Sequence, residues 1–187
     1  MNEIDIAAAW LRRRKTNWYV ITGGPSSGKT TTVNVLRDRG YKTTIEHARH
    51  FIDTQRELGR SVADVRNHQM EFQLGVLEMQ LEQEASISPN DVVFLDRAIP
   101  DALAYYRYLE LPVHPKLTDA LEKVSYKKIF ILHHLPLVND YARLEDEPAQ
   151  LRIHELIVDT YRSLPFPIVF VPVRPAEERV DFILANL

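Results

Sequence analysis

A glycine-rich stretch near the start of the chain has the residue types and spacing of a loop that binds phosphate. Gly23 is followed, after four residues, by Gly28, Lys29 and Thr30, which matches the GxxxxGK[ST] pattern. Glycines permit backbone conformations, and a close approach to an anion, that a Cβ would block. In such a loop the lysine meets the β and γ phosphates of a nucleotide, and the threonine hydroxyl ligates Mg²⁺.

The segments on either side of this loop have the pattern that the motif requires. Residues 18–22 form an apolar run that predicts a buried strand, and residues 30–39 have helical patterning. The N–H groups of the loop therefore converge at a helix N-terminus, where the helix dipole favours an anion. We expect the phosphates of a nucleotide to contact Gly23, Gly24, Pro25, Ser26, Ser27, Gly28, Lys29, Thr30 and Thr31.

An aspartate follows a second buried strand. Residues 92–95 are all apolar and lead directly into Asp96 and Arg97, as in a parallel strand that is covered on both faces. An Asp at the end of such a strand has the form of a Walker B carboxylate, which holds Mg²⁺. We expect Asp96 to act in this way, with Arg97 beside the bound phosphates.

A second carboxylate lies where another predicted strand, residues 41–46, gives way to a helix. Ligands of open α/β sheets collect at the carboxyl ends of strands, so Glu46 and Arg49 are site candidates. In the functional interpretation Glu46 orients or deprotonates a substrate hydroxyl, and Arg49 holds an anionic group. The alternative is a carboxylate at a helix start and an arginine on the surface.

Further charged residues occur late in the chain. Residues 135–148 are polar and irregular, which suits a lid that closes over phosphates. Arg143, or Arg152 on the next helix, would then neutralise charge on the transferred phosphoryl group. A solvated charged loop is the alternative. The loop 172–175, which contains Arg174, is expected near the nucleotide base.

The chain alternates between strands and helices five times. Strands are predicted at residues 18–22, 41–46, 92–97, 128–133 and 166–171. Helices are predicted at residues 3–14, 30–39, 61–86, 101–109, 116–124, 149–164 and 177–187, and Ser61 is the expected cap of the long third one. This alternation predicts an α/β domain with a parallel sheet covered by helices on both faces.

The composition excludes several classes of protein. The 187 residues suit a single domain, residues 1–187. A net charge of −3 gives no general attraction to nucleic acid or to an anionic membrane, and the lack of cysteine excludes disulfides. Acidic residues precede the first apolar stretch and basic residues follow it, the reverse of a secretory signal. We expect a cytoplasmic monomer or homodimer.

The residues of these motifs resemble a known family. The stretches 21–31, 46–49, 94–101, 139–143 and 152–154 look like those of the small AAA-type predicted ATPases of the P-loop kinase-like superfamily, which includes nicotinamide riboside kinase domains. The resemblance implies a three-layer α/β/α fold with the strand order 2-3-1-4-5, and ATP with Mg²⁺. In the similar deoxynucleoside kinases, a Glu after the second strand is the base and an acidic–Arg pair follows the third, the layout of Glu46, Asp96 and Arg97.

Three functions follow from these observations, and the third is a nucleotide-binding scaffold that performs no chemistry. The leading hypothesis is a phosphotransferase that binds ATP·Mg²⁺ at residues 23–31 and a small hydroxyl compound, such as a nucleoside, between Glu46, Arg49 and Asp101. Phosphoryl transfer needs mainly positioning and charge, so these groups suffice. The alternative is an ATPase or nucleotide-dependent switch, with water as the acceptor and a protein partner.

Overall fold

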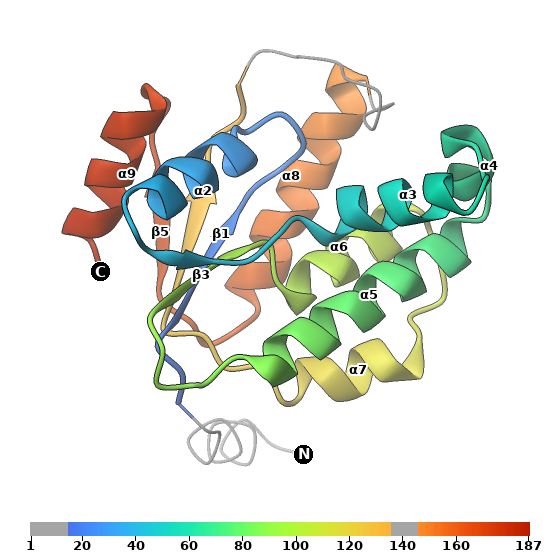
Figure 1. Cartoon of the computed structure of the whole chain (residues 1–187), viewed down its shortest axis with the longest axis horizontal. Coiled ribbons are helices and arrows are strands. Elements are labelled where there is room, and N and C mark those ends of the chain that lie inside the picture. The colour runs from blue at the N-terminus through green and yellow to red at the C-terminus, as the bar shows by residue number, and fades with distance from the viewer. Residues whose placement is uncertain (1–14, 136–145) are drawn as a thin grey trace.

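The structure, a computed structural model, describes residues 15–135 and 146–187. They form a five-stranded parallel sheet flanked by helices (Figure 1). The strands are β1 (Trp18–Thr22), β2 (Lys42–Thr43), β3 (Val93–Asp96), β4 (Lys128–Leu132) and β5 (Ile168–Val171). Their order is β2-β3-β1-β4-β5, which confirms the predicted order and places the strand before the glycine-rich loop in the middle of the sheet.

The helices connect the strands, with three between β2 and β3 and two between β3 and β4. They are α2 (Lys29–Asp38), α3 (His47–Glu57), α4 (Val62–Asn67), α5 (Gln69–Ser86), α6 (Ile99–Tyr108), α7 (Pro115–Leu121), α8 (Glu147–Arg162) and α9 (Ala176–Ala185). None of the helices in the described residues is long and apolar enough to cross a bilayer.

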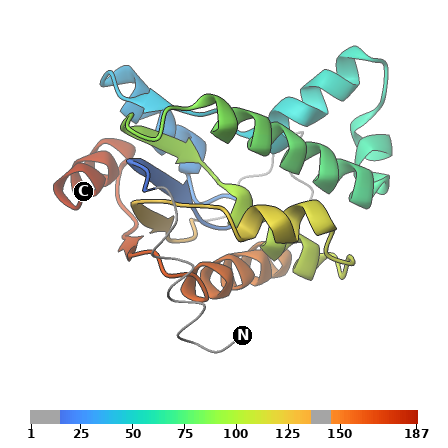
Figure 2. The ribbon, with the colours of Figure 1, turned by 90° about the horizontal axis from the view of Figure 1, so that it is seen from below.

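Alternating side chains of the strands supply two cores. In β1, Tyr19 and Ile21 pack with α2 and α9 on one face of the sheet, whereas Trp18 and Val20 pack with α5, α6, α7 and α8 on the other. Successive strand residues point to opposite faces, and both faces of this parallel sheet are covered. Figure 2 shows the sheet between the two helical layers, which confirms the three-layer prediction.

A smaller core joins helices α3, α4 and α5 beside the sheet. Ile52 of α3, Val65 of α4, and Phe72 and Val76 of α5 are buried against one another. The ring of Phe51 meets that of Phe72 edge-on, with centroids 5.6 Å apart. These helices project to one side of the sheet (Figure 1).

Two predicted elements differ from the structure. The strand predicted at residues 41–46 is paired only at Lys42–Thr43, because the chain leaves β3 after Thr44 and starts α3. The helix predicted at residues 61–86 is interrupted at His68, whose ψ of 61° is not helical. The break turns the chain so that α4 and α5 both reach the smaller core. Ser61 does cap α4, since its Oγ accepts from the Asp64 N–H at 3.1 Å.

The helix predicted at residues 3–14 lies outside the described residues, as do residues 136–145, most of the predicted lid.

Candidate active site

The glycine-rich loop connects the end of β1 to the start of α2 in a conformation that needs its glycines. Gly23 has a φ of 141° and Gly28 a φ of 79°, both in the region that disfavours side chains. A Cβ on Gly23 would lie 2.6 Å from the carbonyl oxygen of Leu132 in β4. The loop therefore fits closely against the end of the sheet, and its last residue leads directly into a helix N-terminus, as the sequence predicted.

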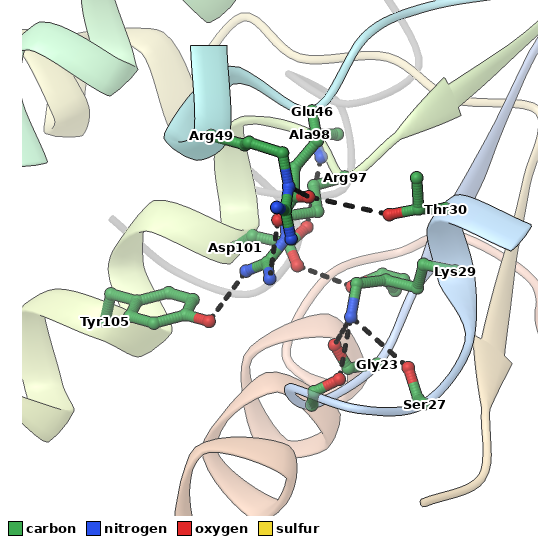
Figure 3. Close-up of polar contacts among 12 residues, drawn as sticks. Gly23, Ser27, Lys29, Thr30, Glu46, Arg49, Arg97, Ala98, Asp101 and Tyr105 are labelled. Carbon is green, nitrogen blue, oxygen red and sulfur yellow. Dashed lines mark hydrogen bonds and ion pairs between the residues drawn. The ribbon is translucent and has the colours of Figure 1, made fainter. Parts of the chain in front are cut away.

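The side chain of Lys29 lies inside the loop. Its Nζ donates to the carbonyl oxygens of Gly23 at 2.8 Å and Gly24 at 2.7 Å, and to Ser27 Oγ at 3.2 Å (Figure 3). Lys29 is only 4 % exposed, and burial together with the charge of Arg97 lowers its pKa. The amino group of Lys29 therefore holds the loop together by hydrogen bonds. An anion bound in the loop would favour the charged form of Lys29.

Asp96 ends β3 beside the loop and is 2 % exposed. Its backbone N–H donates to Thr44 Oγ1 at 2.8 Å, whereas its Oδ1 has no hydrogen-bond partner among the described residues. Burial and the carboxylate of Glu46 raise the pKa of Asp96. A buried carboxylate oxygen without a partner is the type of ligand that Mg²⁺ uses. The donor chemistry therefore fits the cation that the sequence predicted, with the Thr30 hydroxyl at the start of α2 as the second candidate ligand.

Glu46 joins three residues at the entrance to α3 (Figure 3). Its carboxylate accepts from Arg97 Nη2 at 3.4 Å and from Thr30 Oγ1 at 3.5 Å, and lies 3.7 Å from Arg49 Nε. Arg97 in turn donates to the hydroxyl of Tyr105 at 2.7 Å, and its guanidinium carbon lies 5.2 Å from the centroid of that ring. The tertiary structure thus brings Glu46 and Arg49, at the start of α3, together with Arg97, which follows β3.

A pocket opens beside this cluster, between α3, α5 and α6. It is bounded by the charged residues at one side, by aliphatic and aromatic side chains and by two buried glutamine residues. Its lining residues are Pro25, Glu46, His47, Ala48, Arg49, Ile52, Phe72, Gln73, Val76, Gln80, Arg97, Asp101, Ala102 and Tyr105. Most organic ligands are bound in pockets of this composition, largely apolar with a few polar groups.

Asp101 contributes to this pocket wall, but hydrogen bonds occupy both of its carboxylate oxygens. Oδ1 accepts from Thr22 Oγ1 at 2.5 Å, and Oδ2 accepts from the Tyr161 hydroxyl at 2.6 Å and the Ala98 N–H at 3.1 Å. These bonds tie β1, α6 and α8 together behind the pocket. The structure therefore gives Asp101 a role in holding the site, and direct substrate binding by Asp101 stays a prediction.

Two of the arginines predicted from the second half of the chain, Arg152 and Arg174, do not gather with these residues. Arg152 is exposed on α8 and pairs with Glu155 at 3.0 Å. Arg174 lies over the ring of Phe182, with its guanidinium carbon 5.8 Å from the centroid. Arg143 lies outside the described residues. The roles of these three arginines in binding nucleotide or stabilising charge remain predictions.

Two residues to which the sequence analysis assigned no role contact the loop. His154 of α8 accepts a hydrogen bond from the Gly24 N–H on Nδ1 at 3.1 Å, and burial lowers the pKa of its imidazole. Arg179 of α9 donates to the carbonyl oxygens of Ser27 and Gly28. Both lie on helices more than 100 residues further along the chain. No local pattern marks these contacts, because they depend on how α8 and α9 pack.

The sheet order, the loop and the flanking helices define the fold of P-loop kinases. A family model described as an AAA domain matches residues 18–179, and the chain belongs to this family. This confirms the resemblance seen in the sequence. No curated protein sequence matches the chain.

Solved structures show the same fold. A deoxyadenosine kinase from M. mycoides is 14 % identical, with a TM-score of 0.61 over 90 % of this chain and 97 % of that one. A thymidylate kinase from Ehrlichia chaffeensis is also 14 % identical, with a TM-score of 0.59 over 92 % of this chain and 99 % of that one. The NadR protein in complex with NR is 18 % identical, with a TM-score of 0.64 over 94 % of this chain and 52 % of that one.

Proposed function

We propose that the protein transfers the γ-phosphoryl group of ATP·Mg²⁺ to a hydroxyl group of a small molecule. One observation carries this proposal: Glu46, at the start of α3, and Arg97, directly after β3, lie together between the phosphate-binding loop and a pocket. A carboxylate in this position has a reacting group on each side, phosphate on one and an organic acceptor on the other. A protein that only bound a nucleotide would not require a second pocket for an organic acceptor beside the loop.

The roles of the residues follow from their chemistry. The N–H groups of residues 23–31 and the Lys29 ammonium bind the β and γ phosphates. Thr30 and Asp96 are the residues that would hold Mg²⁺, which when bound neutralises charge on the phosphate oxygens. Catalysis then needs mainly positioning and the stabilisation of negative charge.

During transfer, the acceptor oxygen forms a bond to the γ phosphorus while the bond from this phosphorus to the oxygen bridging the β phosphate breaks. The proton of the acceptor hydroxyl goes to Glu46, and ADP leaves. Arg97 stabilises the charge on the equatorial oxygens, because its guanidinium lies beside the same carboxylate. Arg49 orients the acceptor at the mouth of the pocket.

The pocket favours an acceptor with a flat, partly apolar body. Phe72, Val76 and Ile52 offer apolar surface, and the side chains of Gln73 and Gln80 offer amide groups for hydrogen bonds. The names of the structural neighbours, a deoxyadenosine kinase and a thymidylate kinase, agree with this chemistry. We therefore propose a nucleoside, a nucleotide or a similar hydroxyl compound as the acceptor.

A screen for ADP release tests the proposal. The protein is incubated with ATP and MgCl₂ alone and with a panel of nucleosides, nucleoside monophosphates, sugars and vitamins, and the products are identified by mass spectrometry. We expect slow hydrolysis without an acceptor, and a phosphorylated product with one class of compound. ATP turnover that no compound changes, with phosphate as the sole product, would contradict phosphotransferase activity and favour hydrolysis.

A further inference from the structure

Arg179 lies behind the phosphate-binding loop, on the first turns of α9. It is 6 % exposed, and its Nη1 donates to the carbonyl oxygens of Ser27 at 3.1 Å and Gly28 at 3.3 Å. The guanidinium fills the space that a side chain on Gly28 would need, since a Cβ there would collide with Nη1. The loop and this arginine therefore fit each other closely, although they are 152 residues apart along the chain.

The charge of Arg179 has no carboxylate partner within the described parts of the chain. Its Nε, which is also buried, has no hydrogen-bond partner there, and burial alone lowers the pKa of the side chain. A buried cation without an opposite charge costs free energy. Arg39 provides the contrast, because it bridges from the end of α2 to Asp181 at 2.6 Å and Glu177 at 2.5 Å on the same helix. Acidic residues on α9 thus pair with Arg39 rather than with Arg179.

The contacts of Arg179 affect the face of the loop that would meet phosphate. The carbonyl of Ser27 belongs to the same peptide unit as the N–H of Gly28, and the carbonyl of Gly28 to that of Lys29. A cation that binds these carbonyl oxygens orients the two peptide units and strengthens their dipoles, so that each N–H becomes a better donor. The charge itself also adds to the positive potential at the N-terminus of α2.

We propose that Arg179 is a positioning residue for the polyphosphate of the nucleotide. It acts from behind the loop, by fixing and polarising the N–H groups of Gly28 and Lys29, and the bound phosphates supply the negative charge that it otherwise lacks. This inference rests on the proposed binding of ATP at residues 23–31. It adds a residue from the C-terminal helix to the binding of nucleotide.

The competing interpretation is that Arg179 only docks α9 against the loop. The two interpretations predict different effects on the free protein. If Arg179 is an unbalanced charge, its replacement by glutamine leaves the melting temperature of the nucleotide-free protein unchanged or raises it, and weakens ATP binding. If it only docks the helix, the melting temperature falls and the affinity for ATP stays the same.

Calorimetric titration with ATP and with AMP, and thermal unfolding with and without ATP, separate these outcomes. For Arg179→Gln we expect about tenfold weaker binding of ATP, a smaller loss for AMP, and a reduced stabilisation by ATP, since charge-assisted hydrogen bonds exceed neutral ones in strength. Arg39→Gln is the matched control, because it removes a cation that holds α9 without touching the loop. It should lower the melting temperature slightly and leave ATP binding within about twofold, as for an exposed ion pair.

Two further variants keep the test decisive. If Arg179→Gln does not fold, Arg179→Lys is used instead, because it retains the charge but loses the planar guanidinium group. We expect the affinity of Arg179→Lys for ATP to fall several-fold. An unchanged affinity would overturn the inference. Lys29→Ala should abolish most ATP binding whatever Arg179 does. ATP binding that Lys29→Ala removes and Arg179→Gln preserves would contradict this inference alone, whereas a wild-type protein that binds no ATP would contradict the proposed function as well.

Discussion

The carboxylate of Glu46 accepts a hydrogen bond from the guanidinium of Arg97 at 3.4 Å, and only 12 % of the Glu46 side chain is exposed. The second oxygen of this carboxylate accepts from Thr30 at 3.5 Å. One acidic side chain therefore lies between the start of α2 and the end of β3. The carboxylate lies beside the guanidinium groups of Arg97 and Arg49, and its contact with Thr30 links it to the phosphate side of the site.

Replacing Glu46 by glutamine tests its role as the base. The amide keeps the size of the side chain but cannot accept the proton of the acceptor hydroxyl. We expect turnover to fall by about 10²-fold or more, the usual weight of a general base, with ATP affinity within about twofold of the wild type. Glu57→Gln, an exposed carboxylate on the same helix, is the control and should have normal turnover. Normal turnover of Glu46→Gln would leave Glu46 with only a structural role.

Replacing Lys29 by alanine tests the phosphate-binding loop. The variant loses the ammonium that bonds to the Gly23 and Gly24 carbonyls and that would meet the phosphates. We expect ATP affinity measured by calorimetry to fall by about 10²-fold or more, because charge-assisted hydrogen bonds to phosphate are lost. Lys42→Ala, whose exposed ammonium pairs with Asp91, is the control and should bind ATP normally. Unchanged binding in Lys29→Ala would contradict the assignment of the loop.

Replacing Asp101 by asparagine separates its two possible roles. Three donors point at its carboxylate, and the amide NH₂ of asparagine would face at least one of them. We expect urea unfolding to show a loss of about 3 kcal/mol, within the range for breaking a buried charged network, and a smaller loss of about 1.5 kcal/mol for Tyr161→Phe, which removes one of the three donors to the carboxylate. A normal free energy of unfolding with a raised KM for the acceptor would instead support the substrate-binding role predicted from the sequence.

We expect the stability of the folded protein to depend on pH through Glu84, a residue outside the candidate active site. Glu84 accepts from the hydroxyl of Tyr126 at 3.0 Å, and burial raises its pKa to about 8. Between its ordinary pKa and about 8 the folded protein binds a proton that the unfolded chain releases, so stability falls as pH rises through this range.

Replacing Glu84 by glutamine removes this titration and keeps an oxygen that accepts from Tyr126. We expect the variant to melt a few degrees above the wild type at pH 9, corresponding to about 1 kcal/mol, and with little difference at pH 5. A difference that is equal at both pH values would show that Glu84 is not protonated in the folded protein. Glu82→Gln, an exposed neighbour on α5, should leave the melting temperature at pH 9 unchanged.

Much of the fold could be predicted from the sequence because its signals are local. The apolar runs that became β1, β3 and β4 each lie within a few consecutive residues, and the loop pattern of Gly23, Gly28 and Lys29 is contained in a short window. Ser61 marked the start of α4 correctly for the same reason, since a helix cap involves neighbouring residues. The break at His68 was missed because helical periodicity continues through it, and the packing of Val65 and Phe72 on Ile52 decided the turn.

The sequence by itself determined the glycine-rich loop between β1 and α2, the alternation of strands and helices, and two acidic residues, one before α3 and one at the end of β3. Only the tertiary structure decided that hydrogen bonds occupy the Asp101 carboxylate, that Arg152 and Arg174 lie elsewhere, and that His154 and Arg179 contact the loop. The physical reason is the distance along the chain between the residues that interact. Backbone conformation and hydrophobic periodicity depend on neighbouring residues, whereas these contacts join helices far apart in the chain and depend on how those helices pack against the sheet.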